Sequence, residues 1–272
     1  MLTYFFLIYF IADVHNQTYR TIFAKMRFFI EISYRGTNYH GWQVQPNNIT
    51  IQAVINKALS TILKEEIFVT GAGRTDAGVH ANQMYAHFDT KTAFKIDKLI
   101  FRLNQFLPND ITIHNIIKVS NDANCRFDAK NRTYRYFIIN QKNSFIEDAF
   151  LIHKSLDIEK MRQSCKFLLG KHDFTSFTKK HSQTHTNFCN VEYANWHNFD
   201  NKLVFEIRAD RFLWNMVRSM VGTLLQVGEK KMSPDSVRDI LAKKNRSLAG
   251  KTVPAHGLFL HKIEYSNKIF NV

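Results

Sequence analysis

The sequence predicts an α+β fold made of two successive units, each with the element order β-α-β-β-α-β. Two kinds of pattern predict it. Segments in which apolar and polar residues alternate, as in half-buried strands, recur along the chain. Segments with apolar residues three and four positions apart, as in amphipathic helices, lie between them. This order is called ferredoxin-like. Because both units are rich in strand-forming sequence, we expect one extended, mainly antiparallel sheet with helices on one side.

The first unit has the clearer pattern. Its predicted strands cover residues 27–34, 67–70, 82–89 and 111–119, and its predicted helices cover residues 51–63 and 96–106. In the first strand Phe28, Ile30 and Ile32 alternate with more polar residues. Thr50 is a suitable N-cap for the first helix, and "LPND" ends the second. We therefore expect an N-terminal domain over residues 26–122.

The second unit repeats this order loosely, without a repeat of individual residues. Its predicted elements are a strand at 132–140, a helix at 157–169, a hairpin across "FDN", helices at about 212–227 and 233–244, and a final strand at 257–265. Gly170 is expected to end the first of these helices. We expect a C-terminal domain over residues 123–272.

The composition excludes several classes of protein. The chain has 272 residues, of which 45% are hydrophobic, so it is not intrinsically disordered. Its formal charge of +14 favours a polyanionic partner, either nucleic acid or an anionic membrane surface. The three cysteines lie far apart, and the chain has no nucleotide-binding glycine motif and no HExxH. The sequence therefore predicts reduced thiols, no nucleotide cofactor and no zinc.

The N-terminus departs from the pattern of the rest. Residues 2–12 are apolar but only about half as long as a membrane-spanning helix, and they lack the basic start of a signal peptide. Regular patterning begins at Met26. We expect Met26 to be the natural start and residues 1–25 to be a dispensable extension. A weak contact with a membrane or a partner is the alternative.

The stretch "GAGRTDAGVH", residues 71–80, is the first candidate site. Glycine lets a backbone approach a ligand closely. Arg74 and Asp76 lie on the same side of the chain if the loop is extended, so the guanidinium would favour an ionised, accessible carboxylate. A tight turn with a solvated ion pair is the plain alternative, and metal ligation competes, although no second carboxylate has ligand spacing. His80 and His87 are interpreted as structural or RNA-contacting.

Two further segments carry candidate residues. In "NRTYRY", Arg132 and Tyr134 share one face of a strand, and interleaved aromatic and cationic side chains suit single-stranded RNA, although an ordinary sheet face looks the same. "FLWNMVRSMVG" reads as the start of an apolar, buried helix in which Arg218 needs a partner, because an unpaired buried charge is costly.

Five motifs together resemble the TruA-type tRNA pseudouridine synthases. They are "GAGRTDAGVHA" (71–81), "CRFDAKNRTYRY" (125–136), "GKHDFTSF" (170–177), "FLWNMVRSMVG" (212–222) and "PAHGLFL" (254–260). The likeness extends from Arg27 to about Tyr265 with the motifs in the family's order. Two positions depart from it: Arg35 stands where an acidic residue is usual, and Cys125 where a small one is usual.

The resemblance implies a function. Enzymes of this family are homodimers that isomerise uridines at positions 38–40 of the tRNA anticodon arm without a cofactor. It therefore implies a cytoplasmic enzyme with tRNA as its partner and no membrane association. An RNA-binding module without chemistry and a peripheral membrane protein are the alternatives, and against the former no RNP1-like string occurs.

The resemblance also assigns roles to residues. Asp76 is the catalytic nucleophile, and attack on C1′, attack on the base and action as a base in an elimination remain open. Tyr134 stacks on the target uracil, and Arg218 is expected to pair with Asp76. Arg74 and Arg218 are expected to be catalytic together with Asp76 and Tyr134. From the residues themselves, contact with a phosphate and support of the flipped nucleotide are equally open roles for Arg74. Leu258 packs against the base, and Arg132 is a further substrate contact.

Overall fold

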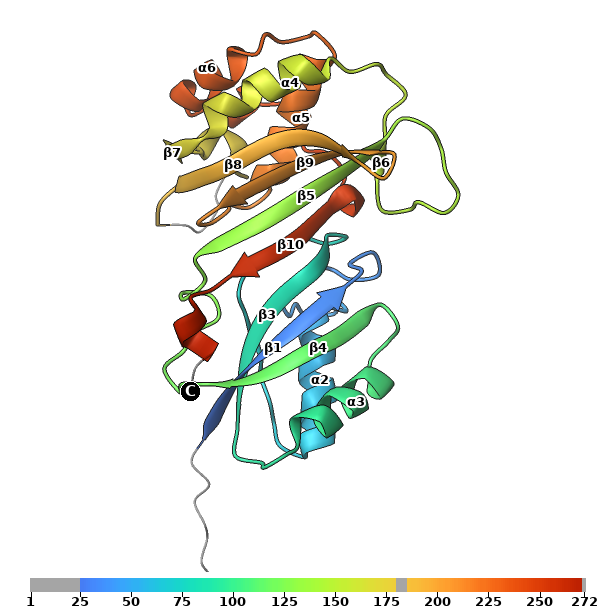
Figure 1. The fold of residues 1–272 in the computed structure, drawn as a ribbon, viewed down its shortest axis with the longest axis vertical. Coiled ribbons are helices and arrows are strands. Elements are labelled where there is room, and N and C mark those ends of the chain that lie inside the picture. The colour runs from blue at the N-terminus through green and yellow to red at the C-terminus, as the bar shows by residue number, and fades with distance from the viewer. Residues whose placement is uncertain (1–24, 180–184, 271–272) are drawn as a thin grey trace, which may run out of the picture.

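The computed structural model describes residues 25–179 and 185–270 and forms one mixed sheet of ten strands (Figure 1). The strand order is β4-β1-β3-β10-β5-β9-β8-β7, with β2 paired to β3 and β6 paired to β5. The pairs β3–β10 and β5–β6 are parallel, and the other pairs are antiparallel. The expected α+β class and the expected extended sheet are therefore present.

Every predicted strand and helix is present, and the C-terminal half has two further short strands, at 150–151 and 170–173, that were not predicted. The strands are β1 (Met26–Tyr34), β2 (Thr70–Gly71), β3 (His80–Thr90), β4 (Ile111–Val119), β5 (Asn131–Ile139), β6 (Phe150–Leu151), β7 (Gly170–Asp173), β8 (Phe188–Phe199), β9 (Lys202–Ala209) and β10 (Leu258–Glu264). The α-helices are α2 (Ile51–Leu63), α3 (Ile96–Phe106), α4 (Ile158–Cys165), α5 (Met216–Gly228) and α6 (Ser236–Lys243).

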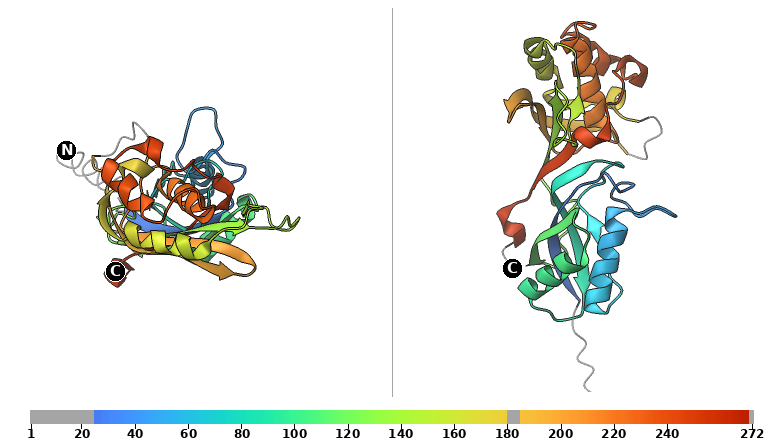
Figure 2. Two further views of the ribbon diagram at one scale, coloured as in Figure 1. Left: turned by 90° about the horizontal axis from the view of Figure 1, so that it is seen from above. Right: turned by 90° about the vertical axis from the view of Figure 1, so that its right-hand side faces the viewer.

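The N-terminal half of the sheet is covered on both faces. Phe28 on one face of β1 contacts the ring of Phe94, just before α3, at a centroid distance of 4.8 Å. Phe29 points to the opposite face, where it meets the rings of Tyr265 and Phe270. Phe270 ends the short 3₁₀ turn η5 (Asn267–Phe270), which lies across the sheet from α2 in Figure 2. Alternation along β1 thus fills two aromatic layers.

The C-terminal half holds a second hydrophobic cluster. Helices α4, α5 and α6 gather over the β9-β8-β7 end of the sheet (Figure 1). Met161 of α4 and Met220 of α5 are completely buried in this cluster together with Trp196 of β8. Asp157 caps α4 by accepting a hydrogen bond from the Lys160 amide, as the helix-start pattern requires.

The two halves meet where β3 pairs with β10. His80 and Ala81 of β3 lie opposite Phe259 and Leu260 of β10 in parallel register. The His80 ring stacks on Phe259, its Nδ1 accepts from the Gly36 amide at 3.1 Å, and its Nε2 donates to the His256 carbonyl at 3.0 Å. A neutral imidazole with its proton on Nε2 satisfies both bonds. His80 is therefore a structural link between the halves.

Two of the predicted boundaries are wrong, for identifiable reasons. The helix expected from residue 212 begins at Met216, because Asn215 has φ 63° in the left-handed region and interrupts a right-handed helix. The strand expected at 67–70 is reduced to Thr70–Gly71, because side chains of α2 compete for its amides. Ser60 accepts from the Ile67 amide, and Asn56 accepts from Val69.

The expectations for residues 1–25 fall almost entirely outside the described residues, which begin at 25. Among the residues that the structure does describe, no helix is both long enough and apolar enough to span a bilayer.

We predict that the stability of the fold falls as the pH is lowered from about 7.5 to 5.5. Burial lowers the pKa values of His80, His87 and His261. In the unfolded chain histidine has a pKa of about 6.5. Below that pH the histidines of the unfolded chain are therefore protonated to a greater extent than these three buried histidines of the folded chain. The stability contributed by the neutral rings is complete above that pH and is lost below it. Urea unfolding at the two pH values measures this.

His80→Ala is the control for this prediction. The variant is less stable at both pH values, since the Gly36 amide and the His256 carbonyl lose their partner, but its loss of stability between pH 7.5 and 5.5 is smaller than that of the wild type. Equal stability of the wild-type chain at both pH values would contradict the prediction.

Candidate active site

The loop between β2 and β3 is anchored through Thr75. This residue is buried, its hydroxyl is 2.8 Å from the hydroxyl of Tyr34, and its carbonyl accepts from the Trp42 amide at 3.1 Å. Its neighbours in the chain are more open: Arg74 is exposed, and the Asp76 side chain is 27% exposed. An inward residue between two outward ones is the alternation of an extended chain. The loop thus presents Asp76 while its backbone stays fixed.

Glycines permit this close packing. A Cβ on Gly71 would lie 2.5 Å from the Trp42 indole, and Gly78 has φ +78°. Gly41, in the neighbouring 34–43 segment, has φ +86°, and a Cβ there would lie 2.5 Å from the Thr75 carbonyl oxygen. By contrast, a Cβ on Gly73 would have nothing within 4 Å. Close approach and backbone conformation therefore explain three of these glycines but not Gly73.

Asp76 forms an ion pair with Arg218, 142 positions later in the chain. The Arg218 Nη1 lies 3.2 Å from Oδ2 of Asp76, and the arginine side chain is 18% exposed. Its Nε donates to the Val253 carbonyl at 2.8 Å, and Nη1 also donates to Oδ1 of Asn215 at 3.1 Å. The expected partner of Arg218 is thus present. Partial burial strengthens the pair relative to one in water.

The segment between β9 and α5 orients these groups. Asn215 is the N-cap of α5, yet its side chain makes no capping bond and instead accepts from Arg218. A non-glycine residue in the left-handed region is strained, and such strain gathers at functional sites. Phe212 packs edge-on against Tyr134 with centroids 5.0 Å apart. Neither Asn215 nor Phe212 was identified from the sequence, because both lay in the expected helix.

Tyr134 of β5 is kept as a neutral phenol. Burial, and then the negative charge of Asp76, raise the pKa of its hydroxyl, against the opposing effect of Arg132. Within the described residues this hydroxyl has no hydrogen-bond partner. A neutral phenol beside an anion is suited to donate a proton or a hydrogen bond.

The remaining predicted residues lie in different surroundings. The side chain of Arg74 makes no ion pair within the described part of the chain, so Arg218 and not Arg74 is the partner of Asp76. Leu258 is buried opposite Tyr136 in the β10–β5 ladder. The guanidinium of Arg132 donates to carbonyl oxygens of Ala72, Arg126, Ala129 and Asp210. Arg132 thereby ties the Asp76 loop to the C-terminal half.

His87, the other histidine considered from the sequence, is also structural. It is buried, and its Nδ1 lies 3.2 Å from Sγ of Cys125. The Cys125 thiol donates to the Thr70 carbonyl, and burial raises the pKa of this thiol to about 12. A buried, protonated thiol is unreactive.

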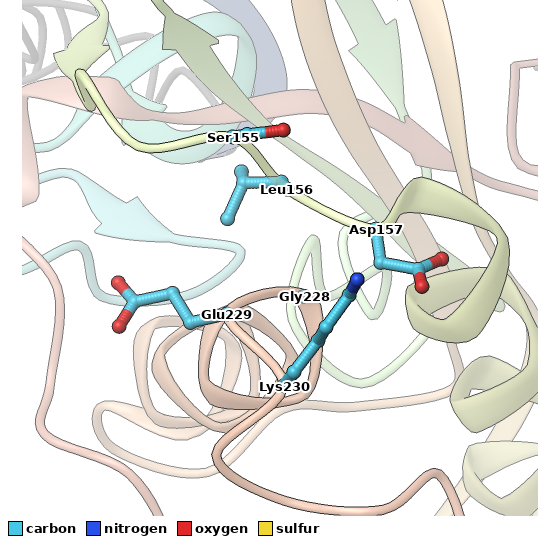
Figure 3. A pocket seen from close by; sticks show the side chains of 6 residues that line it. All are labelled: Ser155, Leu156, Asp157, Gly228, Glu229 and Lys230. Atoms are coloured by element: carbon cyan, nitrogen blue, oxygen red, sulfur yellow. The ribbon is translucent and has the colours of Figure 1, made fainter.

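A metal centre and a separate pocket were also considered. No group of three or more His, Cys, Asp or Glu residues in the described ranges is arranged to hold a metal ion. A pocket lined by Ser155, Leu156, Asp157, Gly228, Glu229 and Lys230 lies at the far end of α5 (Figure 3). Gly228 comes ten residues after Arg218, about 15 Å along a helix. Glu229 there pairs with Lys154 and Lys231.

Comparison with known proteins identifies the family. The family model described as tRNA pseudouridine synthase matches residues 31–128 and 165–266. The chain belongs to this family of isomerases. It is 47% identical over 250 residues to tRNA pseudouridine synthase A of Bacteroides fragilis, covering 91% of this chain and 99% of that protein.

Other members of the family give similar values. The enzyme of the same name from Azobacteroides pseudotrichonymphae is 47% identical over 245 residues, covering 90% of this chain and 98% of the relative. That of Clostridium acetobutylicum is 41% identical over 239 residues, covering 87% and 98%. The resemblance found in the five sequence motifs is thus confirmed over nearly the whole length of these relatives.

We predict that Gly41→Ala disturbs the Asp76 loop while Gly73→Ala does not. At Gly41 the new methyl group meets the Thr75 carbonyl in a left-handed backbone, at a cost of about 1–3 kcal/mol from conformation alone. At Gly73 the methyl group meets open space, so alanine is neutral or stabilises by about 0.4–1 kcal/mol through the unfolded state. Thermal unfolding of both variants checks this. Equal losses of stability would contradict the geometry.

Proposed function

We propose that this chain isomerises uridine to pseudouridine in the anticodon arm of tRNA, at positions 38–40, with Asp76 as the nucleophile. The observation that carries the proposal is the Asp76–Arg218 ion pair at 3.2 Å, formed beside Tyr134 where the two halves of the sheet meet. Membership of the family supports the reaction class. The pair supports the assignment of the reactive carboxylate, because Asp76 is both charge-paired and partly exposed.

The reaction needs only groups of this kind. The bond between C1′ and N1 breaks, the uracil turns, and a bond between C1′ and C5 forms. The proton on C5 leaves and N1 gains one, so the product is an isomer of the substrate and no atoms enter from a co-reactant. Arg218 balances the negative charge of Asp76 through their ion pair. We assign stacking on the base to Tyr134, whose neutral hydroxyl can donate a proton to N1. The Asp76 carboxylate, released when C1′ bonds to C5, can accept the proton that leaves C5.

We assign substrate recognition to residues around the Asp76–Arg218 ion pair. The exposed Arg74 meets a phosphate of the flipped nucleotide. We assign packing against the base to Leu258, which is buried opposite Tyr136 in the β10–β5 ladder. Arg132 acts on the substrate through the loop backbone that it holds. The charge of +14 attracts the tRNA backbone. We further propose a cytoplasmic homodimer and two ferredoxin-like domains divided near residue 122.

We predict that Asp76→Asn abolishes turnover and leaves the fold intact. The amide keeps the shape of the side chain and accepts a hydrogen bond from Arg218, but it is not a nucleophile. Arg218 also retains the Val253 and Asn215 oxygens as partners, so the stability changes by under about 1 kcal/mol. Pseudouridine in an unmodified tRNA transcript is measured by primer extension after carbodiimide treatment.

Asp89→Asn is the matched control. The Arg27 guanidinium donates twice to Asp89 and lowers the pKa of that carboxyl to about 2. The amide variant should lose roughly 2 kcal/mol of stability at neutral pH and still turn over. Near wild-type turnover by Asp76→Asn would contradict the proposal. Tight tRNA binding by a wild-type chain that makes no pseudouridine would favour the RNA-binding module instead.

A further inference from the structure

Trp214 stands out among the tryptophans of this chain. Trp42 and Trp196 are 1% and 0% exposed, whereas Trp214 is 48% exposed. Tryptophan is highly buried on average, so an open indole calls for an explanation. Its neighbour Leu213 is buried in the C-terminal cluster and begins the turn that the Met216 amide closes on the Leu213 carbonyl at 3.1 Å.

The exposed indole is nevertheless held in place. The Trp214 carbonyl accepts from the Lys179 amide at 3.1 Å and from the Thr178 hydroxyl at 3.3 Å. The Lys179 ammonium lies 4.1 Å from the ring centroid, as in a cation–π contact. Among the described residues no other aromatic ring packs against Trp214. A cation covers one face of the ring, and nearly half of the residue remains open to solvent.

Trp214 also adjoins the reactive pair. It immediately precedes Asn215, whose Oδ1 accepts from the same Arg218 nitrogen that contacts Asp76. Two residues before it, Phe212 backs Tyr134. This one short segment therefore supports the tyrosine, orients the arginine and displays an aromatic surface with a positive charge.

We propose that Trp214 is the stacking platform for a nucleobase next to the target uridine, with Lys179 meeting the adjoining phosphate. This inference rests on the proposed function. A uridine that leaves its stack deprives its neighbour of a stacking partner. An exposed indole replaces that partner for any base, because every base has a π-face. Stacking thus binds the base without selecting its identity. The positive ammonium of Lys179 over the ring complements the negative charge of the RNA backbone.

The three tryptophans provide a direct test by fluorescence. Acrylamide reaches Trp214 in the free protein, because the other two indoles are buried. An unmodified tRNA transcript should shield Trp214 from acrylamide with the same half-saturation as binding measured by gel shift. Trp214→Ala should weaken binding of that transcript about tenfold, the order expected for one lost stack, and Trp214→Phe should recover most of the loss.

Phe199→Ala is the control, since Phe199 is 58% exposed in the hairpin at the other end of β9 and should bind as the wild type does. The proposal is overturned if the transcript binds and is modified while Trp214 stays open to acrylamide and Trp214→Ala binds normally. In that outcome the proposed function stands. If the wild-type chain neither binds nor modifies the transcript, both proposals fail.

Discussion

The parallel pairing of β3 with β10 is the contact on which the site depends. It joins only two residues of each strand directly, yet it sets a strand of the N-terminal half beside a strand of the C-terminal half. Parallel strands cannot be joined by a tight turn, so the chain between β3 and β10 has to cross over before β10 can pair with β3. His80 strengthens it with two hydrogen bonds and a stacked ring. Asp76 lies four residues before His80 and is delivered to this junction.

The groups that we propose to act in the reaction accordingly come from elements that lie far apart in the sequence. Asp76 belongs to the loop before β3, Tyr134 to β5 and Arg218 to α5. The segment between β9 and α5 connects them: Asn215 gives up a helix-capping bond to hold Arg218. A strained backbone and an uncapped helix end are costs to stability. Their position beside Asp76 indicates that the cost maintains the geometry of the site.

Much of the fold was predictable, because the spacing of apolar residues along a strand or a helix shows which of its faces is buried. The strands around Phe28 and the amphipathic α2 appear where the pattern places them. The predicted boundaries that were wrong depend on interactions that the spacing of apolar residues does not show. The apolar run from Phe212 resembles a buried helix, but its first residues are not helical, because a turn with Asn215 in the left-handed region precedes the helix. Similarly, nothing local shows that α2 side chains bind the amides near Val69.

The candidate site divides in the same way. Motif resemblance pointed to Asp76, Tyr134 and Arg218 as site residues. The need of the buried Arg218 for a partner predicted an ion pair, and the structure pairs it with Asp76. For Asp76, sequence spacing suggested Arg74 as the charge partner, because Arg74 is only two residues away. A contact with a residue 142 positions later cannot be read from the sequence. The carbonyl oxygens that accept hydrogen bonds from Arg132 could not be predicted either, because every residue type carries a backbone carbonyl.

In the proposed mechanism the positive charge of Arg218 makes Asp76 reactive, and the variant Arg218→Gln removes that charge. Glutamine retains a hydrogen-bond donor but removes the positive charge. The single-turnover rate of pseudouridine formation, with enzyme in excess over tRNA, should fall at least about a hundredfold, the order found when one electrostatic contact in an active site is lost. Affinity for tRNA and cooperative unfolding should persist. A rate near that of the wild type would contradict the account.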